Sequence, residues 1–424
     1  MWPATGLSLQ PARGISLSTT DLQKAPEQRN SAVLILASEW RLPYRTLRCA
    51  ALCFDHVYVV GTKEAHPLAR SLFCQSFHYL PFEDGFGRTS IPFINRLCDQ
   101  LSIDWVIPSD AHTTRFLTEN KGALGPKSYP VPDTATFELL NDKSAFIGLC
   151  ENLDIPTPQT EVLPNKQQLL DRIQGGHLKL PLVAKPINRE GSYGVEVLHD
   201  EQALGVADRL EYEPIMAQEF IGGRDLCAFY LCRQGRIELE VLYHHGGHFI
   251  EFIEHQDIGQ QCRKIIEATH YNGVLGFDVR QSDSSDFYFL ECNPRFWYNM
   301  ELTMLAGLNF VEAGVKVPKL AEQPLNVSLA GKIVTRPSGL LRKSPTPRAG
   351  SSARLAVLGY LTGDFPMMVS IGLNKAVRTV KTTLGMDSVS VGACPWQPAD
   401  GSERRHAVKT GGRTVRRGDM PTRP

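Results

Sequence analysis

The sequence contains no long hydrophobic run. None of its apolar stretches reaches the roughly 20 residues that a helix needs to span a bilayer. The N-terminal segment MWPATGLSLQPARGISLSTT lacks the basic start and the apolar core of a signal peptide. Hydrophobic residues make up 42% and charged residues 21% of the chain, which are ordinary values for a globular protein. We therefore predict a cytoplasmic protein without a membrane anchor.

The ten cysteines form no metal-binding or disulfide pattern. They are scattered from Cys49 to Cys394, and none belongs to a CxxC pair. A chain of 424 residues is large enough to fold without disulfides. Reduced, mostly buried thiols are therefore expected.

The sequence also has no net charge, because 45 Lys and Arg balance 45 Asp and Glu. This balance hides a basic C-terminal region, since residues 331–424 contain 16 Lys and Arg but five Asp and Glu. A basic tail can contact nucleic acid or anionic lipid. Its Pro, Ser, Gly and Arg content is also typical of a solvated extension. We expect a poorly ordered extension with no nucleic-acid or membrane partner.

The chain has room for two or three domains at roughly 150 residues each. Residues 1–30 are polar and lack periodicity, so we expect them to be disordered. In residues 31–130, short apolar runs alternate with helical stretches, which predicts a parallel α/β sheet. Residues 131–330 combine helical stretches with strands that turn at glycines and with a hairpin at 274–294. The fold class expected is mixed α/β, followed by the basic extension at 331–424.

The hairpin at 274–294 ends in polar side chains. Side chains alternate along a strand, so Glu291 and Asn293 of FLECNPRFW point the same way, and Asp278 lies on the preceding strand. Together they offer oxygen ligands that suit Mg²⁺ or Mn²⁺. Arg295 follows, where a guanidinium can grip a phosphate or a carboxylate. The alternative is a surface hairpin with a capped end.

Two further stretches suggest a nucleotide. In VAKPINREGSYGVEV, Lys185 ends a strand and precedes a loop with Gly191 and Gly194, which can bring backbone N–H groups to phosphate oxygens. No GK[ST] follows, so this is not a Walker A loop, and an ordinary glycine hairpin is the alternative. In QEFIGGRDL, the strand can meet a purine near Glu219, and Asp225 can hold ribose hydroxyls.

The stretch YHHGGHF offers a zinc alternative with His244, His245 and His248. Consecutive strand residues face opposite ways, so His244 and His245 cannot easily share one ion. One of these two histidines can face an active site instead.

Read in order, several motifs resemble those of the ATP-grasp superfamily, namely NDKSAF, LVAKP, GSYGV, QEFIGGRDL, GFDVR and LECNPRFW. The resemblance points to branches near carbamoyl-phosphate synthase large chains and carboxylate–amine ligases. It runs from about Ser31 to Val317, and HPLARSLFCQSFHYLP and DWVIPSD resemble the pre-ATP-grasp domain. It implies a pre-ATP-grasp parallel-sheet domain at 31–130. An ATP-grasp domain at 131–330 would follow, with two α+β subdomains clasping ATP and a mobile lid at about 160–217.

The resemblance also implies a role for each matching residue. Lys143 and Lys185 would contact the ATP phosphates, and Arg295 would stabilise the transferring phosphoryl group. The flap over the phosphates would consist of Gly191, Ser192, Tyr193 and Gly194. Adenine would be bound by Glu219, Phe220 and Gly222, and ribose by Asp225. The metal ligands would be Asp278, Glu291 and Asn293, with Glu291 bridging two ions.

The implied activity is that of an ATP-dependent ligase, with carbon–nitrogen bond formation expected. A small-molecule carboxylate would become an acyl phosphate, and an amine or another nucleophile would then displace phosphate. A carbamoyl-phosphate synthase-like or biotin carboxylase-like enzyme that uses bicarbonate is an alternative, although the sequence has no AMKM biotin signature and no glutaminase domain. A non-catalytic ATP-binding module is another, and a homodimer is possible. Bulky Tyr193, Tyr298 and Asn299 depart from the family pattern, and the sequence identifies neither substrate.

Overall fold

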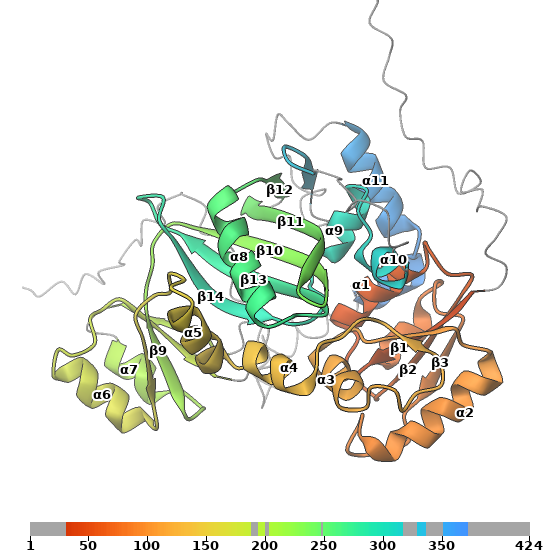
Figure 1. Ribbon diagram of the computed structural model, residues 1–424, viewed down its shortest axis with the longest axis horizontal. Helices are drawn as coiled ribbons and strands as arrows, with labels where there is room; N and C mark the ends of the chain where they lie inside the picture. The colour runs from red at the N-terminus through yellow and green to blue at the C-terminus, as the bar shows by residue number, and fades with distance from the viewer. Residues whose placement is uncertain are drawn as a thin grey trace, which may run out of the picture.

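The computed structural model describes residues 31–187, 194–199, 203–246, 249–316, 329–335 and 351–371. Their strands form three separate sheets (Figure 1). The predicted disordered segment 1–30 and most of the basic extension lie outside the described residues. None of the described helices is both long and apolar enough to cross a membrane. The nine described cysteines are free thiols, as expected.

The N-terminal sheet is parallel and has the order β3-β2-β1-β4-β5. All six residues of β1 are buried because helices and neighbouring elements cover both faces of the sheet, and this confirms the predicted parallel α/β sheet. Asp110 begins α3 with a capping box to Thr113. The strands are β1 (Ala32–Ala37), β2 (His56–Gly61), β3 (Ser76–Tyr79), β4 (Trp105–Ile107) and β5 (Lys127–Ser128). The helices are α1 (Arg41–Ala50), η1 (His66–Arg70), η2 (Arg88–Ser90), α2 (Ile91–Leu101) and α3 (Ala111–Glu119).

The largest sheet has the order β14-β13-β10-β11-β12-β15. Its strands are β10 (Arg224–Arg233), β11 (Arg236–Gly246), β12 (Phe249–Ile253), β13 (Gly273–Gln281), β14 (Phe287–Asn293) and β15 (Ile333–Thr335). β13 and β14 form the predicted hairpin. One face packs against α5 (Lys143–Asn152) and α8 (Gln256–Ala268) through an apolar core that includes Phe277, Phe146 and Ile265. The other face looks towards the N-terminal sheet and carries Cys227, Phe229 and Tyr243.

A smaller antiparallel sheet forms a separate lobe (Figure 1). Its order is β6-β9-β7-β8, and its own apolar core includes Leu169, Leu198 and Ala217. The elements are β6 (Thr160–Leu163), α6 (Lys166–Gln174), β7 (Leu182–Pro186), β8 (Glu196–Leu198), α7 (Ala203–Asp208) and β9 (Ile215–Glu219). The lobe covers the segment that the resemblance marks as a lid. Helix α4 (Thr134–Asn141) and then α5 connect the N-terminal sheet to this lobe.

Part of the expected C-terminal extension belongs to the folded structure. β15 pairs with β12, and Arg48 Nη2 of α1 donates to the carbonyl of Tyr360 in α11 (Ser351–Thr362) at 2.7 Å. Helices α9 (Met300–Leu305) and α10 (Phe310–Val315) also pack against α1. After α11, the Asp364 carboxylate accepts hydrogen bonds from Tyr44 Oη at 2.9 Å, from Ser71 Oγ at 2.6 Å and from the Leu72 N–H at 2.9 Å. These contacts differ from our expectation of a poorly ordered segment, because one buried acid ties the segment to the N-terminal domain.

Candidate active site

The polar end of the hairpin brings two carboxylates and a carboxamide together. Asp278 of β13 lies directly opposite Glu291 of β14, and a bulge follows between Asp278 and Val279. The side-chain nitrogen of Asn293 lies 3.1 Å from Asp278 Oδ2 and 3.4 Å from Glu291 Oε1. The predicted alternation of side chains therefore places all three groups on one side of the sheet.

Lys143 approaches this acidic cluster from helix α5. Its Nζ lies 3.4 Å from Glu291 Oε2, and the residue is buried. Asp142 caps the helix, because its Oδ1 accepts the Ala145 N–H at 2.8 Å. The cap fixes the start of α5 and so positions Lys143 beside β14.

Lys185 approaches the same cluster from the small lobe. Its Nζ donates to Gln218 Oε1 at 2.9 Å and to the Leu290 carbonyl at 3.3 Å. Leu290 belongs to β14, so this buried lysine joins the small sheet to the large one. Gln218 is held in turn, because its Nε2 donates to Thr160 Oγ1 at 2.9 Å. Sequence analysis missed Gln218, which shows no motif of its own.

Burial and charge separate the protonation equilibria of these groups. Burial, and then the negative charge of Glu291, raise the pKa of Asp278 to about 7. Burial acts in the same direction on Glu291, but Lys143 and Lys185 outweigh it and hold the pKa of Glu291 at about 2. Burial lowers the pKa of Lys185 to about 8, although the two carboxylates oppose this shift. Two acids and two lysines thus form a cluster whose negative and positive charges nearly cancel.

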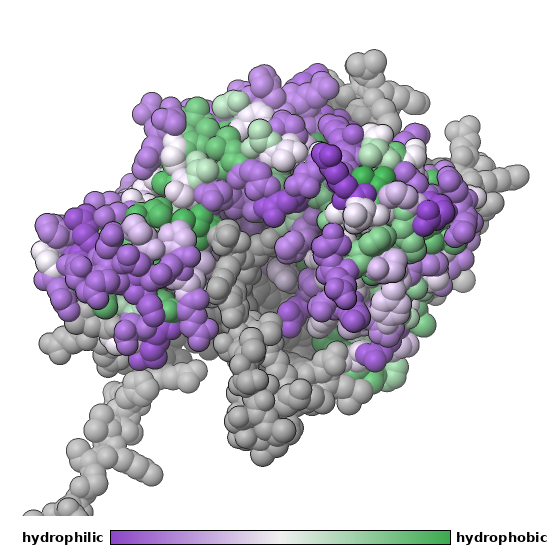
Figure 2. Space-filling model, turned by 90° about the horizontal axis from the view of Figure 1, so that it is seen from below, coloured by the Kyte–Doolittle hydropathy of each residue, from purple (hydrophilic) through white to green (hydrophobic). Residues whose placement is uncertain are grey.

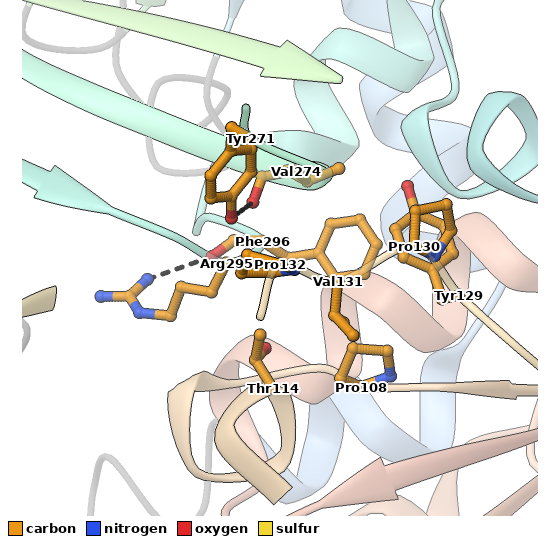
Figure 3. A pocket seen from close by; sticks show the side chains of 10 residues that line it. All are labelled: Pro108, Thr114, Tyr129, Pro130, Val131, Pro132, Tyr271, Val274, Arg295 and Phe296. Carbon is orange, nitrogen blue, oxygen red and sulfur yellow. Dashed lines mark hydrogen bonds between the residues drawn. The ribbon is translucent and has the colours of Figure 1, made fainter. Parts of the chain in front are cut away.

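Arg295 extends the cluster beyond β14. Its Nη2 donates to Asn293 Oδ1 at 2.8 Å, and its Nη1 donates to the Phe296 carbonyl at 3.0 Å. In Figure 3 its guanidinium points away from the aromatic rings of Tyr129 and Phe296. Its stem lines a small pocket together with Pro108, Thr114, Tyr129, Pro130, Val131, Pro132, Tyr271, Val274 and Phe296. The guanidinium is therefore held close to the carboxylates by the carboxamide between them.

The residues predicted to bind adenine and ribose are arranged less tightly. Asp225 forms an ion pair with Arg280, with Oδ1 and Nη1 2.6 Å apart, so one carboxylate oxygen is already engaged. Glu219 is exposed at the end of β9, and its N–H donates to the Gln159 carbonyl at 2.8 Å. The Phe220 ring lies 6.0 Å from the His199 ring. Gly222 is exposed, and a methyl group there would meet no atom closer than 3.6 Å.

The predicted flap lies mostly outside the described residues, which include neither Gly191, Ser192 nor Tyr193. Gly194 is described and has a φ of +80°, and an added Cβ would come within 3.1 Å of the Tyr212 ring. Glycine is therefore required at this position. Nearby, Asp142, Pro186, Ile187, Glu211, Tyr212, Glu213 and Pro214 line an open hollow. Figure 2 shows a mostly hydrophilic surface over the small lobe, at the left of the view.

The two described histidines of YHHGGHF lie on opposite faces of β11. His244 faces Glu251 of β12, with Nε2 3.6 Å from Oε2. His245 faces the candidate site, with Nε2 3.3 Å from Cys227 Sγ, which itself lies 3.3 Å from Asp278 Oδ1. His248 lies outside the described residues. His245 is therefore the one of the two histidines that faces the candidate site, as the alternative to zinc allowed. Cys227 was not among the predicted site residues, although its position two residues after Asp225 on the same strand could have identified it.

The donor set suits a hard divalent cation. Two carboxylates and a carboxamide oxygen are the ligands that Mg²⁺ prefers, and the site lies beside two lysines that would also face an anionic ligand. A cation here requires the Asn293 side chain to present Oδ1 in place of Nδ2, which is a half-turn about its terminal bond. Among the described residues, no three His, Cys, Asp or Glu side chains gather as a metal site, so the carboxamide is needed to complete this one.

Comparison with known proteins gives one family match and many structural ones. Residues 211–333 match the family described as "ATP-grasp in the biosynthetic pathway with Ter operon". No curated protein sequence matches the chain. Carboxyaminoimidazole ribonucleotide synthase from Aspergillus clavatus, complexed with ATP, is similar in structure with a TM-score of 0.54 and 14% identity. That match covers 72% of this chain and 81% of the other.

Two further solved structures give similar values. An L-amino acid ligase from Bacillus licheniformis aligns with a TM-score of 0.51 and 17% identity, over 68% of this chain and 74% of its own. A biotin carboxylase complex with β,γ-ATP from Campylobacter jejuni aligns with a TM-score of 0.53 and 15% identity, over 68% of this chain and 72% of its own. The three similar structures therefore share one arrangement of sheets with this chain.

Proposed function

Because the chain has the ATP-grasp fold, which confirms the resemblance seen in its sequence, we propose that it is an ATP-dependent ligase. It would activate a small-molecule carboxylate as an acyl phosphate, and an amine or another nucleophile would then form the product, with release of ADP and phosphate. The observation that carries this proposal is the convergence of Asp278, Glu291 and Asn293 with Lys143 and Lys185. A capped surface hairpin would not need two buried lysines at its polar end.

In this proposal the two lysines bind phosphate oxygens. Both ammonium groups are buried and lie within 3.4 Å of atoms of β14. A triphosphate bound there would lose its contacts with water and gain contacts with two positive charges whose positions are fixed. Asp278, Glu291 and Asn293 would hold Mg²⁺ or Mn²⁺, with Glu291 bridging two ions. The metal would neutralise the negative charge that develops on the phosphoryl oxygens. Arg295 would stabilise the transferring phosphoryl group from the Asn293 side.

The remaining assignments place the rest of the nucleotide between the lobes. The loop at residues 191–194 would close over the phosphates, as part of a lid that comprises about residues 160–217. Adenine would lie against Glu219, Phe220 and Gly222, mainly through backbone groups. Asp225 would hold the ribose with its second carboxylate oxygen, because Arg280 engages the first. Lid closure would exclude water from the acyl phosphate.

Both substrates are unknown, so the experiment varies the carboxylic acid and replaces the unknown amine with hydroxylamine. Hydroxylamine traps an acyl phosphate as a hydroxamate whichever amine is the natural one, so a panel of carboxylic acids can be tested with ATP, Mg²⁺ and hydroxylamine. We expect at least one acid to give hydroxamate and ADP in equal amounts. Glu291→Gln should abolish both products, whereas Glu240→Gln, an exposed acid on β11, should abolish neither. ATP binding without acid-dependent ADP release across the panel would favour a non-catalytic binding module, and bicarbonate-dependent release would favour the carboxylase-like alternative.

A further inference from the structure

A row of side chains continues the candidate site across the large sheet. Asp278 on β13 pairs with Cys227 on β10, and Cys227 pairs with Tyr243 on β11. His245 lies two residues after Tyr243 and therefore on the same face. Its Nε2 lies 3.3 Å from Cys227 Sγ, and that sulfur lies 3.3 Å from Asp278 Oδ1. One thiol thus separates an imidazole from the acidic cluster.

The position of His245 is opposite to that of the lysines. Lys143 and Lys185 contact groups of β14, at one edge of the sheet. His245 lies on β11, and the order β14-β13-β10-β11 puts Asp278 between the two sides. A carboxylate activated at Asp278 and Glu291 would therefore have its phosphate towards β14, while the surface over β10 and β11 remains for the attacking group.

Aromatic, apolar and sulfur-containing side chains are among the neighbours of His245. The residue is half-buried, its ring lies edge-on to Tyr243 at 5.3 Å, and its partner on β12 is the apolar Ile250. The Tyr243 hydroxyl accepts a hydrogen bond from Asn299 at 3.4 Å. On β10, Cys227 contacts His245, and the Asp225 carboxylate on the same face is paired with Arg280.

We propose that the nucleophile binds over β10 and β11 and that His245 accepts its proton, an inference that rests on the proposed ligase function. The nitrogen lone pair forms a bond to the acyl carbon, and the bond from this carbon to the phosphate oxygen breaks. Phosphate leaves with the bonding electrons, and the proton of the attacking N–H passes to the imidazole. Lys143 and Lys185 lie against β14, away from the attacking group, and the carboxylates of the cluster would be bound to metal. His245 then returns the proton to solvent, to which it is partly open.

The test compares two nucleophiles in the wild type and two variants. Hydroxylamine is strongly nucleophilic and largely unprotonated at neutral pH, so it needs little help from a base. An acid that gives hydroxamate with the wild type is then offered with ammonia or with the twenty common amino acids as amines. We expect His245→Gln to keep hydroxamate formation within about threefold and to lose amide formation by about 100-fold or more. The loss should shrink as the pH is raised from 7 to 9. His244→Gln, one residue away on the opposite face, should change neither rate.

Nucleotide affinity, measured with a fluorescent ATP analogue, should be the same for His245→Gln and the wild type, as a readout independent of turnover. If His245→Gln does not fold, the wild type decides through rates divided by the fraction of each nucleophile that is unprotonated at each pH. The corrected rate of amide formation should still fall at acid pH, whereas the corrected rate of hydroxamate formation should not. Equal loss of both products in His245→Gln, or corrected pH profiles that are parallel in the wild type, would overturn the role of His245 and leave the ligase function intact. A wild type that forms no hydroxamate with any acid would overturn both.

Discussion

Replacing Asp278 with asparagine should make the metal-free protein more stable at alkaline pH. The substitution keeps the shape of the side chain and removes a charge that burial and the neighbouring Glu291 disfavour. In the unfolded chain this carboxyl group loses its proton near its ordinary value of 3.8, and in the folded protein it does so at about 7. The folded state therefore binds the proton more tightly.

The sign and the size of the effect follow from this difference. Stability contributed by the protonated Asp278 is complete below about pH 4 and declines as the pH rises to about 7, where the decline ends. Each pKa unit corresponds to about 1.4 kcal/mol, so the full cost of ionisation is about 4 kcal/mol. Ionised Asp278 also attracts buried Lys185, which offsets part of this cost, so we expect the asparagine variant to gain about 2–4 kcal/mol over the wild type between pH 4 and pH 8.

The assay is urea denaturation in EDTA at pH 4, 6 and 8, with the difference in free energy of unfolding taken at each pH. Asp283→Asn, an exposed change at the turn of the same hairpin, should show a difference that does not depend on pH. Adding Mg²⁺ at pH 8 should then stabilise the wild type more than Asp278→Asn, because the ion neutralises the charge that the variant lacks. An asparagine variant that is uniformly less stable, with no dependence on pH or on Mg²⁺, would refute the acidic cluster as a cation site.

Three other changes test separate parts of the structure. Lys185→Met should weaken ATP binding about 10- to 100-fold, which is the scale of one charge-assisted hydrogen bond, and it should change adenosine binding by no more than about twofold. Both affinities are measured by calorimetry, and the same substitution at exposed Lys179 should change neither. Glu291→Gln should lower ATP turnover by orders of magnitude at every Mg²⁺ concentration, and it should also lower the melting temperature, because the carboxylate pairs with buried Lys143. Near-normal turnover would remove the metal assignment. Asp364→Ala should lower the free energy of unfolding by about 2–4 kcal/mol, because it takes the acceptor from the buried Tyr44 and Ser71 hydroxyls and from the partly buried Leu72 N–H. An unchanged urea midpoint would show that the C-terminal segment is not part of the core.

Local patterns in the sequence predicted much of the framework. The alternation of short apolar runs with helical stretches in residues 31–130 reflects interactions within a few residues, and the structure confirms the parallel sheet that it predicts. The Asp278, Glu291 and Asn293 cluster was also predictable, because one hairpin contains all three residues and strand alternation fixes their direction. Their roles in metal binding remain predictions.

Contacts between distant segments were harder to predict. Lys143 meets Glu291, and Lys185 meets Leu290, across more than 100 residues of sequence, and no periodic pattern encodes such a distance. Cys227 was missed, and the choice between His244 and His245 stayed open, for the same reason, because strand neighbours across a sheet depend on register rather than on motif. The C-terminal segment shows weak periodicity, and a single acid, Asp364, provides much of its polar attachment.

The hydrogen bond from Lys185 to the Leu290 carbonyl has a consequence for motion between the lobes. An ammonium group has three N–H bonds, and Gln218 and Leu290 already engage two of them. Of these two hydrogen bonds, the one to the Leu290 carbonyl joins the small lobe to the large sheet. A phosphate that binds Lys185 would therefore compete with this hydrogen bond between the lobes. If the triphosphate binds Lys185 as proposed, it would weaken this link between the small lobe and the large sheet at the moment when the nucleotide itself begins to join them. Lys185 would thus couple the angle between the two lobes to the charge of the bound nucleotide, and we expect the lobes to adopt different mean angles with ADP and with ATP.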